Sequence, residues 1–443
     1  MRQKTILVLF GGCSTEHDIS LQSAQGVLEH MDRSRWLPLM VGITCQGEWL
    51  CYNGPVSAIG DGSWEQDRSH CTPCTLSLDR DKHQLLLLGD RVSRVSFDGA
   101  FPILHGKNGE DGTIQGLLEL AGIPFAGCGA LSSALCMDKD RSHRLAALAG
   151  VSSPKGLVFA AGADRADIQA AADTLGYPLF VKPVRSGSSF GISRVTQPAG
   201  LLPAVEEAFG HDREVLLEEA VDGFEVGCAV LGNEEPTLGR VDEIELSGGF
   251  FDFTEKYTLK TSAIHCPARI SPEKAQEIQQ AAKTVYRALD CRGFARVDLF
   301  LTAGGQVLFN EVNTIPGFTA HSRYPNMMKA AGLDFTSLVE LQARTLEDGM
   351  PRIRPHSQHM CTYLSAVVLC DQADPDALAQ LQKLKKHRDF KLSLHGWMEF
   401  RIAAVDLSTG DIATNRSGKD LGKSLSGLVA REIQKFKLRR GET

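Results

Sequence analysis

Residues 295–313 read ARVDLFLTAGGQVLFNEVN, two β-type runs separated by a short turn. The adjacent glycines, Gly304 and Gly305, are typical of a two-residue turn in which both central residues have positive φ. Such a turn places Ala303 opposite Gln306, so the numbers of paired residues add up to 609. The stretch therefore predicts an antiparallel hairpin whose register decides which side chains meet.

In this register Asp298 lies opposite Glu311, and Arg296 lies opposite Asn313, with all four side chains on one face. Two facing carboxylates repel each other in a bare sheet, whereas a bound divalent cation removes that penalty. Oxygens of Asp, Glu and Asn are the hard ligands that Mg²⁺ prefers. We therefore predict a magnesium site here; the alternative is a solvated charged face with an incidental Asp–Glu pair. Apolar residues are expected to fill the opposite face: Val297, Leu299, Leu301 and Leu308.

The composition is that of a globular protein with several cores. The chain has 443 residues, of which 43% are hydrophobic and 23% are charged. Its apolar runs are much shorter than the roughly 20 residues that span a bilayer, and no secretory signal is apparent. The twelve cysteines form no disulfide framework, which is typical of a reducing compartment. We expect a cytoplasmic protein without a membrane span.

Charge divides the chain near residue 350. Sixteen basic and ten acidic residues lie beyond position 350, a net charge of +6, which leaves −13 for residues 1–350. Because the main body is acidic, no nucleic-acid partner is expected. The tail is predicted to form a separate α+β module. Its strands are expected at 362–370 and 397–406, its helices at 374–388 and 421–438, and a turn at 408–411.

Strands and helices alternate in the N-terminal part, which indicates an α/β fold with a parallel sheet. The expected strands there are 4–10, 37–44 and 97–104, and the expected helices are a segment ending near Met31, 113–120 and 130–149. A second region follows from Val151. Its expected strands are 178–183, 190–195, 214–219 and 225–231, followed by the hairpin, and its expected helices are 166–175, 199–209, 272–289, 324–331 and 335–346.

Lys182 stands near the end of a predicted strand and precedes a Ser/Gly loop at 185–191. Backbone N–H groups, hydroxyls and a lysine together suit a triphosphate, although no Walker motif is present and the loop alone is equally an ordinary turn. The segment 216–221, followed by Glu225, offers backbone and carboxylate groups for adenine and ribose. The alternative for that segment is an ordinary edge strand.

Five motifs then carry a resemblance to a known family. They are residues 10–18 (FGGCSTEHD), 105–112 (HGKNGEDG), 137–139 (MDK), 255–257 (EKY) and 310–317 (NEVNTIPG). With them the chain resembles the D-alanine–D-alanine ligase family of ATP-grasp enzymes over about residues 4–348. It is most similar to the vancomycin-resistance branch, which shares Cys13 and the SRYP of residues 322–325.

The resemblance implies a three-domain ATP-grasp ligase that binds ATP between its second and third domains. The expected boundaries are 1–127 for an N-terminal α/β domain, 128–213 for a central domain and 214–349 for a catalytic domain. Residues 350–443 would be an additional α+β module of unknown role. A homodimer is also expected from the family.

The resemblance further implies a role for each site residue. Phosphates of ATP would be held by Lys139, Lys182, Ser189 and Lys256, adenine by Glu218 and Val221, and ribose by Glu225. Two Mg²⁺ ions, for which Mn²⁺ can substitute, would be bound by Asp298, Glu311 and Asn313. Glu16 would hold the ammonium of the first D-alanine, with Ser188 and Tyr257 hydrogen-bonded to it. Arg296 and the Gly317 backbone would stabilise an anionic acylphosphate intermediate, beneath a flap at 247–261.

The second substrate would lie near His105, Asp242, Phe251, Ser322 and Arg323. D-lactate-forming members of the resistance branch lack the Glu-Lys-Tyr flap motif, and D-alanine ligases usually have an apolar residue in place of Arg323. A methyl group would leave this cation unpaired, whereas a hydroxymethyl group would pair with it directly or through Asp242. We predict a D-alanine–D-serine ligase that makes peptidoglycan precursors, as in vancomycin resistance. The alternatives are a D-alanine–D-alanine ligase and, for Arg323, a surface or inter-helix salt bridge.

One further motif, Cys71 and Cys74 beside His70, suggests zinc or redox chemistry. No second cysteine pair lies at zinc-finger spacing, so a loop with free thiols is the expectation.

Overall fold

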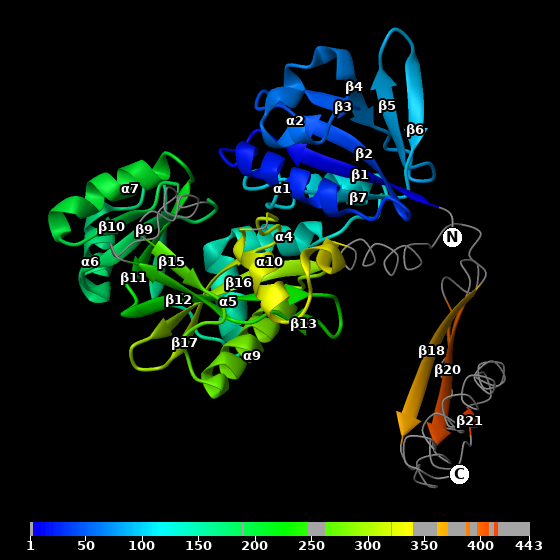
Figure 1. Cartoon of the computed structure of the whole chain (residues 1–443). Coiled ribbons are helices and arrows are strands. Elements are labelled where there is room, and N and C mark those ends of the chain that lie inside the picture. The colour runs from blue at the N-terminus through cyan, green and yellow to red at the C-terminus, as the bar shows by residue number, and fades with distance from the viewer. Residues whose placement is uncertain are drawn as a thin grey trace. The chain divides into compact units, whose positions relative to one another are not determined.

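The computed structural model describes residues 3–187, 190–246, 262–319 and 321–339, and beyond them the backbone of four strands in the C-terminal region. The chain divides into two compact units, Met1–Met350 and Pro351–Thr443. Figure 1 shows the elements of both units, which are described separately below. In the described residues no helix is both long enough and apolar enough to cross a bilayer.

A seven-stranded sheet begins the first unit, in the order β6-β5-β4-β3-β2-β1-β7. The strands are β1 (Lys4–Gly11), β2 (Trp36–Ile43), β3 (Trp49–Tyr52), β4 (Cys71–Leu76), β5 (Gln84–Leu88), β6 (Val92–Ser96) and β7 (Gly99–Pro102). β1 pairs in parallel with β2 and β7, as predicted, and the strands from β3 to β6 add antiparallel pairs that were not predicted.

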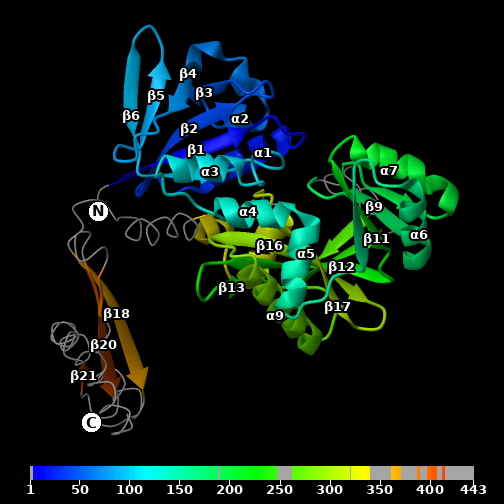
Figure 2. The ribbon, with the colours of Figure 1, turned by 180° about the vertical axis from the view of Figure 1, so that it is seen from behind.

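Helices cover both faces of this sheet, as the two opposite views show (Figures 1 and 2). On one face lie α1 (His17–His30) and α2 (Ser57–Gly60), and on the other lies α3 (Thr113–Leu120). Alternate residues of β1 explain the arrangement, because Ile6, Val8 and Phe10 pack in one core and Leu7 and Leu9 in the other. Short 3₁₀ helices η1 (Ser63–Glu65) and η2 (Arg68–His70) precede β4.

The expectation of a loop at Cys71 and Cys74 is wrong, because both residues lie in β4. Their thiols are free. Burial raises the pKa of Cys74 to about 12, so this thiol is unreactive. No group of three or more His, Cys, Asp or Glu side chains in the described residues is arranged to hold a metal ion.

The single helix predicted at 130–149 is two helices, α4 (Ala130–Met137) and α5 (Lys139–Leu148). Asp138 separates them with extended backbone angles, φ −87° and ψ 103°, and its carboxylate accepts the N–H of Arg141 at 3.0 Å. An Asp at the N-cap stabilises a helix by about 1 kcal/mol. As a result, Lys139 begins α5, and its N–H donates to the Val184 carbonyl at 3.1 Å.

A four-stranded sheet has the order β10-β9-β11-β8. It consists of β8 (Gly156–Ala160), β9 (Leu179–Pro183), β10 (Ser193–Val195) and β11 (Glu214–Glu219). Helices α6 (Arg165–Leu175) and α7 (Leu201–Phe209), preceded by η3 (Pro198–Gly200), cover one face. β11 lies between β9 and β8, so the alternative of an edge strand for residues 216–219 is wrong.

A six-stranded sheet has the order β15-β14-β12-β16-β17, with β13 paired to β12. Its strands are β12 (Gly223–Leu231), β13 (Thr237–Leu238), β14 (Asp242–Leu246), β15 (Ser262–His265), β16 (Phe294–Thr302) and β17 (Val307–Asn313). Helix α9 (Pro272–Ala288) packs on the face that carries Val226, Val297 and Leu299. Helix α10 (Arg323–Ala330) lies on the opposite face, which carries the polar site residues.

The pairing predicted for the hairpin of β16 and β17 is confirmed, but the turn that joins the strands differs from the prediction. Asp298 does lie opposite Glu311, and Arg296 opposite Asn313. The turn, however, is a three-residue loop closed by a bond from Thr302 N–H to the Gln306 carbonyl at 2.9 Å. Gly305 has a positive φ of 81°, whereas Gly304 does not, so the predicted two-residue turn is wrong.

A β-bulge compensates for the longer loop. Pairing runs from Leu301–Val307 to Leu299–Phe309 and then shifts, leaving Asn310 as the extra residue before Glu311. The expectation that Leu308 faces away from the site is also wrong, because Leu308 pairs with Phe300 below the bulge. Val297, Leu299 and Leu301 do lie in the core on the opposite face.

The C-terminal unit contains β18 (Cys361–Cys370) parallel to β20 (Trp397–Asp406). Both strands were predicted within one residue of these bounds. β19 (His387–Asp389) and β21 (Ile412–Thr414) pair antiparallel with β20. The predicted helix 374–388 is therefore wrong at its C-terminal end; its residues up to 386, the turn at 408–411 and the helix at 421–438 lie outside the described residues, as does the end of the helix predicted at 335–346.

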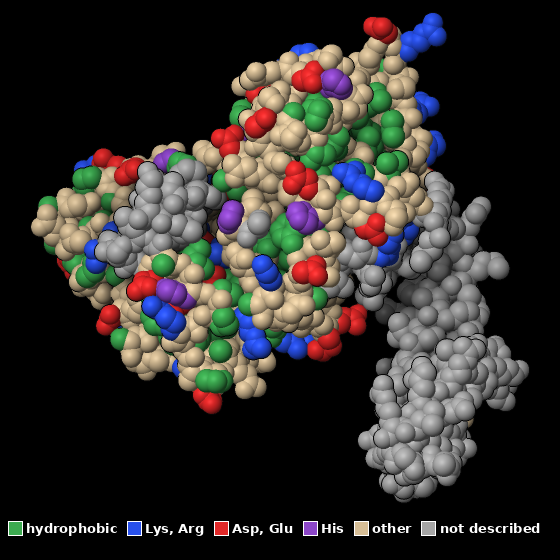
Figure 3. All heavy atoms as spheres, viewed as in Figure 1, with side chains coloured by type: hydrophobic (Ala, Val, Ile, Leu, Met, Phe, Trp, Pro, Cys, Tyr) green, Lys and Arg blue, Asp and Glu red, His purple; other side chains and the backbone are tan. Residues whose placement is uncertain are grey.

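The surface of the first unit mixes charges of both signs. In the space-filling view, acidic and basic side chains are interspersed over the described part of the visible face (Figure 3).

Candidate active site

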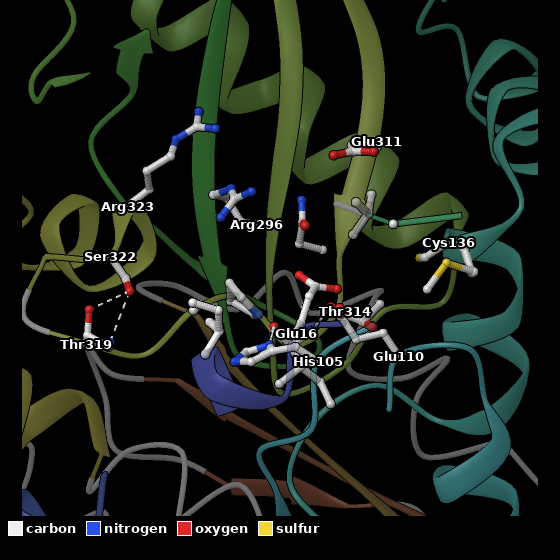
Figure 4. Close-up of a pocket in the computed structure, with 18 of the residues that line it drawn as sticks. Glu16, His105, Glu110, Cys136, Arg296, Glu311, Thr314, Thr319, Ser322 and Arg323 are labelled. Carbon is white, nitrogen blue, oxygen red and sulfur yellow. Dashed lines mark hydrogen bonds between the residues drawn. The ribbon is translucent and has the colours of Figure 1, made fainter. Parts of the chain in front are cut away.

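A cavity of about 390 Å³ lies in the first unit and brings together segments from all three of its sheets (Figure 4). Nine predicted site residues line it: Glu16, His105, Lys139, Arg296, Glu311, Asn313, Gly317, Ser322 and Arg323. The fold therefore brings to one cavity residues that lie up to 307 positions apart in the sequence.

The hairpin carboxylate Asp298 is 1% exposed and lies beneath the cavity lining. The Arg296 guanidinium donates to both of its oxygens, from Nε at 2.8 Å and from Nη2 at 2.7 Å. Asn313 Nδ2 also donates to Asp298 Oδ2 at 2.8 Å. The pairing of these side chains confirms that they share one face.

Glu311, the other hairpin carboxylate, points toward Lys139. Its Oε2 lies 3.8 Å from Lys139 Nζ, which also donates to the Ser186 carbonyl at 2.7 Å. Each of the two facing carboxylates is thus balanced by its own cation, Asp298 by Arg296 and Glu311 by Lys139. Two carboxylates and an amide on adjacent strands provide the hard oxygen donors that suit Mg²⁺.

Lys182 of β9 and Glu218 of β11 form a buried ion pair on the sheet face opposite α6 and α7. Lys182 Nζ also lies 5.5 Å from the centre of the Phe180 ring. The second carboxylate oxygen of Glu218, Oε2, is buried and has no hydrogen-bond partner within the described residues. A buried acceptor without a partner is costly, so this oxygen suits the donor group of a ligand.

Arg323, the first residue of α10, lies in a cluster of acidic side chains. Its Nε and Nη2 each donate to Asp242 at 2.8 Å, and its Nη1 donates to Glu225 at 2.7 Å and lies 3.4 Å from Asp298 Oδ1. Burial by itself would lower the pKa of Arg323, but the charges of Asp242 and Asp298 raise it well above its usual range. The guanidinium is therefore permanently charged.

This pairing corrects one step of the sequence argument. Arg323 is not left unpaired when a methyl group is the neighbouring substrate, because Asp242 and Glu225 already neutralise it. The alternative of a surface or inter-helix salt bridge is wrong, because the pair is buried and both acidic partners lie on strands, Asp242 on β14 and Glu225 on β12; Arg323 still lines the cavity. Three of its N–H groups are bonded in the described residues, and a guanidinium carries five.

Gly227 of β12 makes room for this cluster. It pairs with Asp242 on β14 and with Asp298 on β16, so both carboxylates flank it in the sheet. A Cβ built at Gly227 would lie 2.5 Å from Arg323 Nη2. A side chain at position 227 would therefore force the guanidinium to shift, a constraint that the sequence did not reveal.

Ser322 is held by the loop that precedes α10. Its Oγ accepts the Thr319 N–H at 3.1 Å and lies 2.9 Å from Thr319 Oγ1. A Cβ at Gly317 would lie 3.0 Å from the same oxygen, so a side chain at Gly317 would crowd Ser322. Thr319 was not predicted as a site residue, although it lies close to Ser322 in the sequence.

His105 is buried and connects the N-terminal region to the segment between β17 and α10, which contains Ile315. Its Nδ1 lies 2.8 Å from the Ile315 carbonyl, and its Nε2 lies 3.1 Å from Ser23 Oγ. Because a carbonyl only accepts, Nδ1 carries the proton and Nε2 accepts from Ser23. Burial lowers the pKa of His105, which keeps the ring neutral. Ser23 Oγ in turn accepts the Phe318 N–H at 3.1 Å.

Glu110 lines the cavity beside Glu16 and was not singled out from the sequence (Figure 4). Its carboxylate accepts the N–H of Gly106 at 2.9 Å and that of Ile315 at 3.0 Å. Burial, followed by the charge of Glu16, raises the pKa of Glu110 to about 8. Its place in the 105–112 motif could have marked Glu110 as a site residue. Its contact with Ile315, which is 205 residues away in the sequence, has no local signal.

The remaining predicted residues are placed only in part. Val221 is half-buried between β11 and β12. The flap at 247–261 lies wholly outside the described residues, and so do these predicted residues: Ser188, Ser189, Phe251, Lys256 and Tyr257. Gly187, which precedes Ser188, lies close to Glu16, since a Cβ built on it would be 3.6 Å from Glu16 Oε2.

Two family models match the first unit. The model described as D-ala D-ala ligase N-terminus covers residues 5–128, and that described as D-ala D-ala ligase C-terminus covers residues 150–342. A third model, described as a domain of unknown function, matches residues 326–427.

Known relatives differ in the substrate that their names give. A putative D-alanine–D-lactate ligase of Streptomyces coelicolor is 45% identical over 346 residues, which is 77% of this chain and 96% of the relative. A D-alanine–D-alanine ligase of Caldicellulosiruptor bescii is 42% identical over 347 residues, which is 77% of this chain and 94% of the relative. The crystal structure of the VanG D-Ala:D-Ser ligase from Enterococcus faecalis has a TM-score of 0.73 and 52% identity, and the match covers 78% of this chain and all of that one.

The sheets, the cavity and these likenesses define an ATP-grasp enzyme, an ATP-dependent ligase that forms ADP. The chain belongs to the D-alanine–D-alanine ligase family. Its reaction joins D-alanine to a second small substrate, and such ligases use ATP with Mg²⁺.

Proposed function

We propose that this enzyme joins D-alanine to D-serine and so makes a dipeptide for peptidoglycan precursors. The observation that carries the proposal is Arg323, which lines the cavity next to Ser322 while Asp242 holds its guanidinium. A hydroxyl of the second substrate is an acceptor for an N–H of Arg323 that Asp242 and Glu225 do not use. A methyl group offers no such bond, so D-alanine would leave a buried donor less well satisfied.

The second-substrate pocket is completed by neighbouring groups. Ser322 would bind the substrate carboxylate, and His105 and Phe251 would lie beside the substrate. Similarity to the VanG D-Ala:D-Ser ligase, at 52% identity, supports D-serine over D-alanine. The D-alanine–D-alanine ligase of Caldicellulosiruptor bescii, at 42% identity, keeps D-alanine as the second candidate.

For the first half-reaction, Glu16 would hold the ammonium of D-alanine, with Ser188 and Tyr257 bonded to it. Lys139, Lys182, Ser189 and Lys256 would bind the phosphates, and Glu225 the ribose. Glu218 and Val221 would bind adenine, for which Glu218 Oε2, without a partner among the described residues, provides an acceptor. Mg²⁺, in two ions, would be held by Asp298, Glu311 and Asn313, and would neutralise the phosphate charge.

Arg296 would act on the reacting group together with the Gly317 backbone. Its guanidinium donates to both oxygens of Asp298, and both Arg296 and Gly317 line the cavity. From there they would stabilise the anionic acylphosphate and then the oxyanion.

The test is to supply ATP, Mg²⁺ and D-alanine with D-serine, D-alanine or D-lactate as the second substrate, and to compare kcat/KM. We expect D-serine to give the highest value at neutral pH. A higher value for D-alanine would make the enzyme a D-alanine–D-alanine ligase, and a higher value for D-lactate would refute the argument from the flap motif.

Arg323→Met should shift the ratio of D-serine to D-alanine kcat/KM toward D-alanine by about tenfold, the effect of one hydrogen bond to a charged donor. Lys329→Met is the matched control, because it removes a cation from an exposed position on the same helix. An unchanged ratio in Arg323→Met would remove Arg323 from the selectivity argument.

The domain division at 127 and 213, and a homodimer, stay predictions. Sedimentation of the full chain would measure its mass in solution, and a monomeric mass would contradict the dimer.

A further inference from the structure

The β-bulge in β17 decides where Glu311 points. Below it, the three-residue loop sets Leu301 opposite Val307, and continuation of that register would put Asn310 opposite Asp298. Glu311 would then pair with Val297, whose face packs in the apolar core under α9. The extra residue moves Glu311 opposite Asp298 and onto the polar face. The bulge is therefore what brings the two carboxylates together.

Residues outside the sheet bind two backbone groups of this bulge, the Asn310 carbonyl and the Phe309 N–H. β17 is the last strand in the sheet order, so its outer edge faces the segment that contains α5 and the residues after it. His143 Nε2 lies 2.8 Å from the Asn310 carbonyl, and the Phe309 N–H donates to the Ser152 carbonyl at 2.7 Å. The His143 ring also meets the Phe309 ring edge-on at 5.5 Å.

In the hydrogen bond between His143 and Asn310, the histidine is the donor. A carbonyl oxygen only accepts, so Nε2 must carry the hydrogen and donate to Asn310. His143 lies four residues after Lys139 on α5, so one helix contacts both Glu311 and the bulge. Lys139 Nζ approaches Glu311 directly, whereas His143 acts on the peptide that precedes it.

We propose that His143 is a positioning residue for the cation site, because its Nε2–H bond to the Asn310 carbonyl holds the bulge that aims Glu311 at Asp298. The inference rests on the proposed binding of the metal ion by Asp298 and Glu311. His143 touches neither substrate nor metal in this arrangement. It fixes the peptide next to a metal ligand, and residues that hold a ligand in place commonly tune the affinity of the site for the metal.

Two substitutions separate the hydrogen bond from the packing. His143→Phe keeps the edge-on ring contact with Phe309 and removes the donor. His143→Gln removes the ring and keeps an N–H donor at nearly the position of Nε2. A purely structural role for the ring would make Phe the milder change, whereas the positioning role makes Gln the milder change.

The readout is Mn²⁺ binding to the full chain in the presence of ADP, followed through the paramagnetic resonance signal of free Mn²⁺. We expect His143→Phe to raise the Kd for Mn²⁺ about five- to tenfold, as the loss of one hydrogen bond implies, and His143→Gln to stay within about twofold of the wild type. The KM for ATP at saturating Mg²⁺ should change less than the Mg²⁺ concentration needed for half-maximal activity. The substitution leaves in place the charges of Lys182 and Glu218, which lie near position 143.

Failure of this inference is distinct from failure of the proposed function. If His143→Phe binds Mn²⁺ as tightly as the wild type, or if His143→Gln binds it as weakly as His143→Phe, His143 has no positioning role. Glu311→Gln is the reference variant. If the wild type and Glu311→Gln bind Mn²⁺ equally, the cation site itself is elsewhere, and the proposed function is wrong at that point. Should His143→Phe fail to fold, a weak Mn²⁺ affinity in folded His143→Gln would overturn the inference by itself.

Discussion

Removal of Arg323 should destabilise the protein strongly, because the buried Asp242 carboxylate loses the guanidinium that donates to both of its oxygens. Asp242 is fully buried, the side chain of Asp298 is 2% exposed and that of Glu225 is 15% exposed. Arg323 donates three bonds of 2.7–2.8 Å to two of them. Breaking a buried pair by removal of one partner costs about 3–5 kcal/mol, so Arg323→Met should lower the unfolding free energy by about 4 kcal/mol.

A double-mutant cycle with Asp242→Asn measures the interaction free energy between Arg323 and Asp242 more directly. Asp242→Asn removes the carboxylate that would otherwise remain unpaired, so its effect and that of Arg323→Met should overlap. We expect a coupling energy of about 2 kcal/mol, with the double variant less destabilised than the sum of the single variants. Urea unfolding of the full chain, followed by circular dichroism, measures all four free energies. Lys329→Met is the control and should change stability by less than about 0.5 kcal/mol.

A loss of less than about 1 kcal/mol in Arg323→Met, the range of a surface ion pair, would contradict this expectation, and so would additivity of the two substitutions. Either result would mean that the carboxylates around Arg323 are solvated or protonated in the native protein.

Three further perturbations test other parts of the structure. Gly227→Ala should destabilise the protein by about 2 kcal/mol, because its methyl group would lie 2.5 Å from Arg323 Nη2, and urea unfolding without any loss would show that the guanidinium can move aside. Glu110→Gln should flatten the pH dependence of stability. With a pKa raised from 4.5 to about 8, Glu110 in the folded protein keeps a proton that the unfolded chain has lost, so wild-type stability falls from about pH 5 to about pH 8, by up to about 1.4 kcal/mol per pH unit. Equal slopes in the two proteins would contradict this assignment. Asp138→Ala should cost about 1–2 kcal/mol through loss of the α5 N-cap and raise the KM for ATP by displacing Lys139, and an unchanged KM would separate the cap from nucleotide binding.

Much of the site was predictable because its residues lie in short motifs. The pairing of Asp298 with Glu311 followed from counting residues across the hairpin. That prediction was right for a reason that the sequence did not contain, since a longer loop and a bulge shift the register in opposite directions. Local turn propensity identified the glycines but not the conformation of Gly304.

The features that sequence reasoning missed depend on contacts between distant residues. Arg323 meets Asp242 and Glu225 across 81 and 98 residues, and no local pattern indicates that three strands place their carboxylates around one cation. The break at Asp138 was missed because residues on both sides favour a helix, whereas the capping bond to Arg141 and the ion pair with Arg185 stabilise an extended residue there. The short strands β3 to β6 carry too few alternating residues to be separated from loops.

We propose above all that the two facing carboxylates of the hairpin bind the divalent cation that serves ATP. The direct measurement is the anomalous scattering of Mn²⁺ in crystals of the full chain grown with ADP. We expect a peak at about 2 Å from oxygens of both Asp298 and Glu311. A peak bound to neither carboxylate would contradict this assignment.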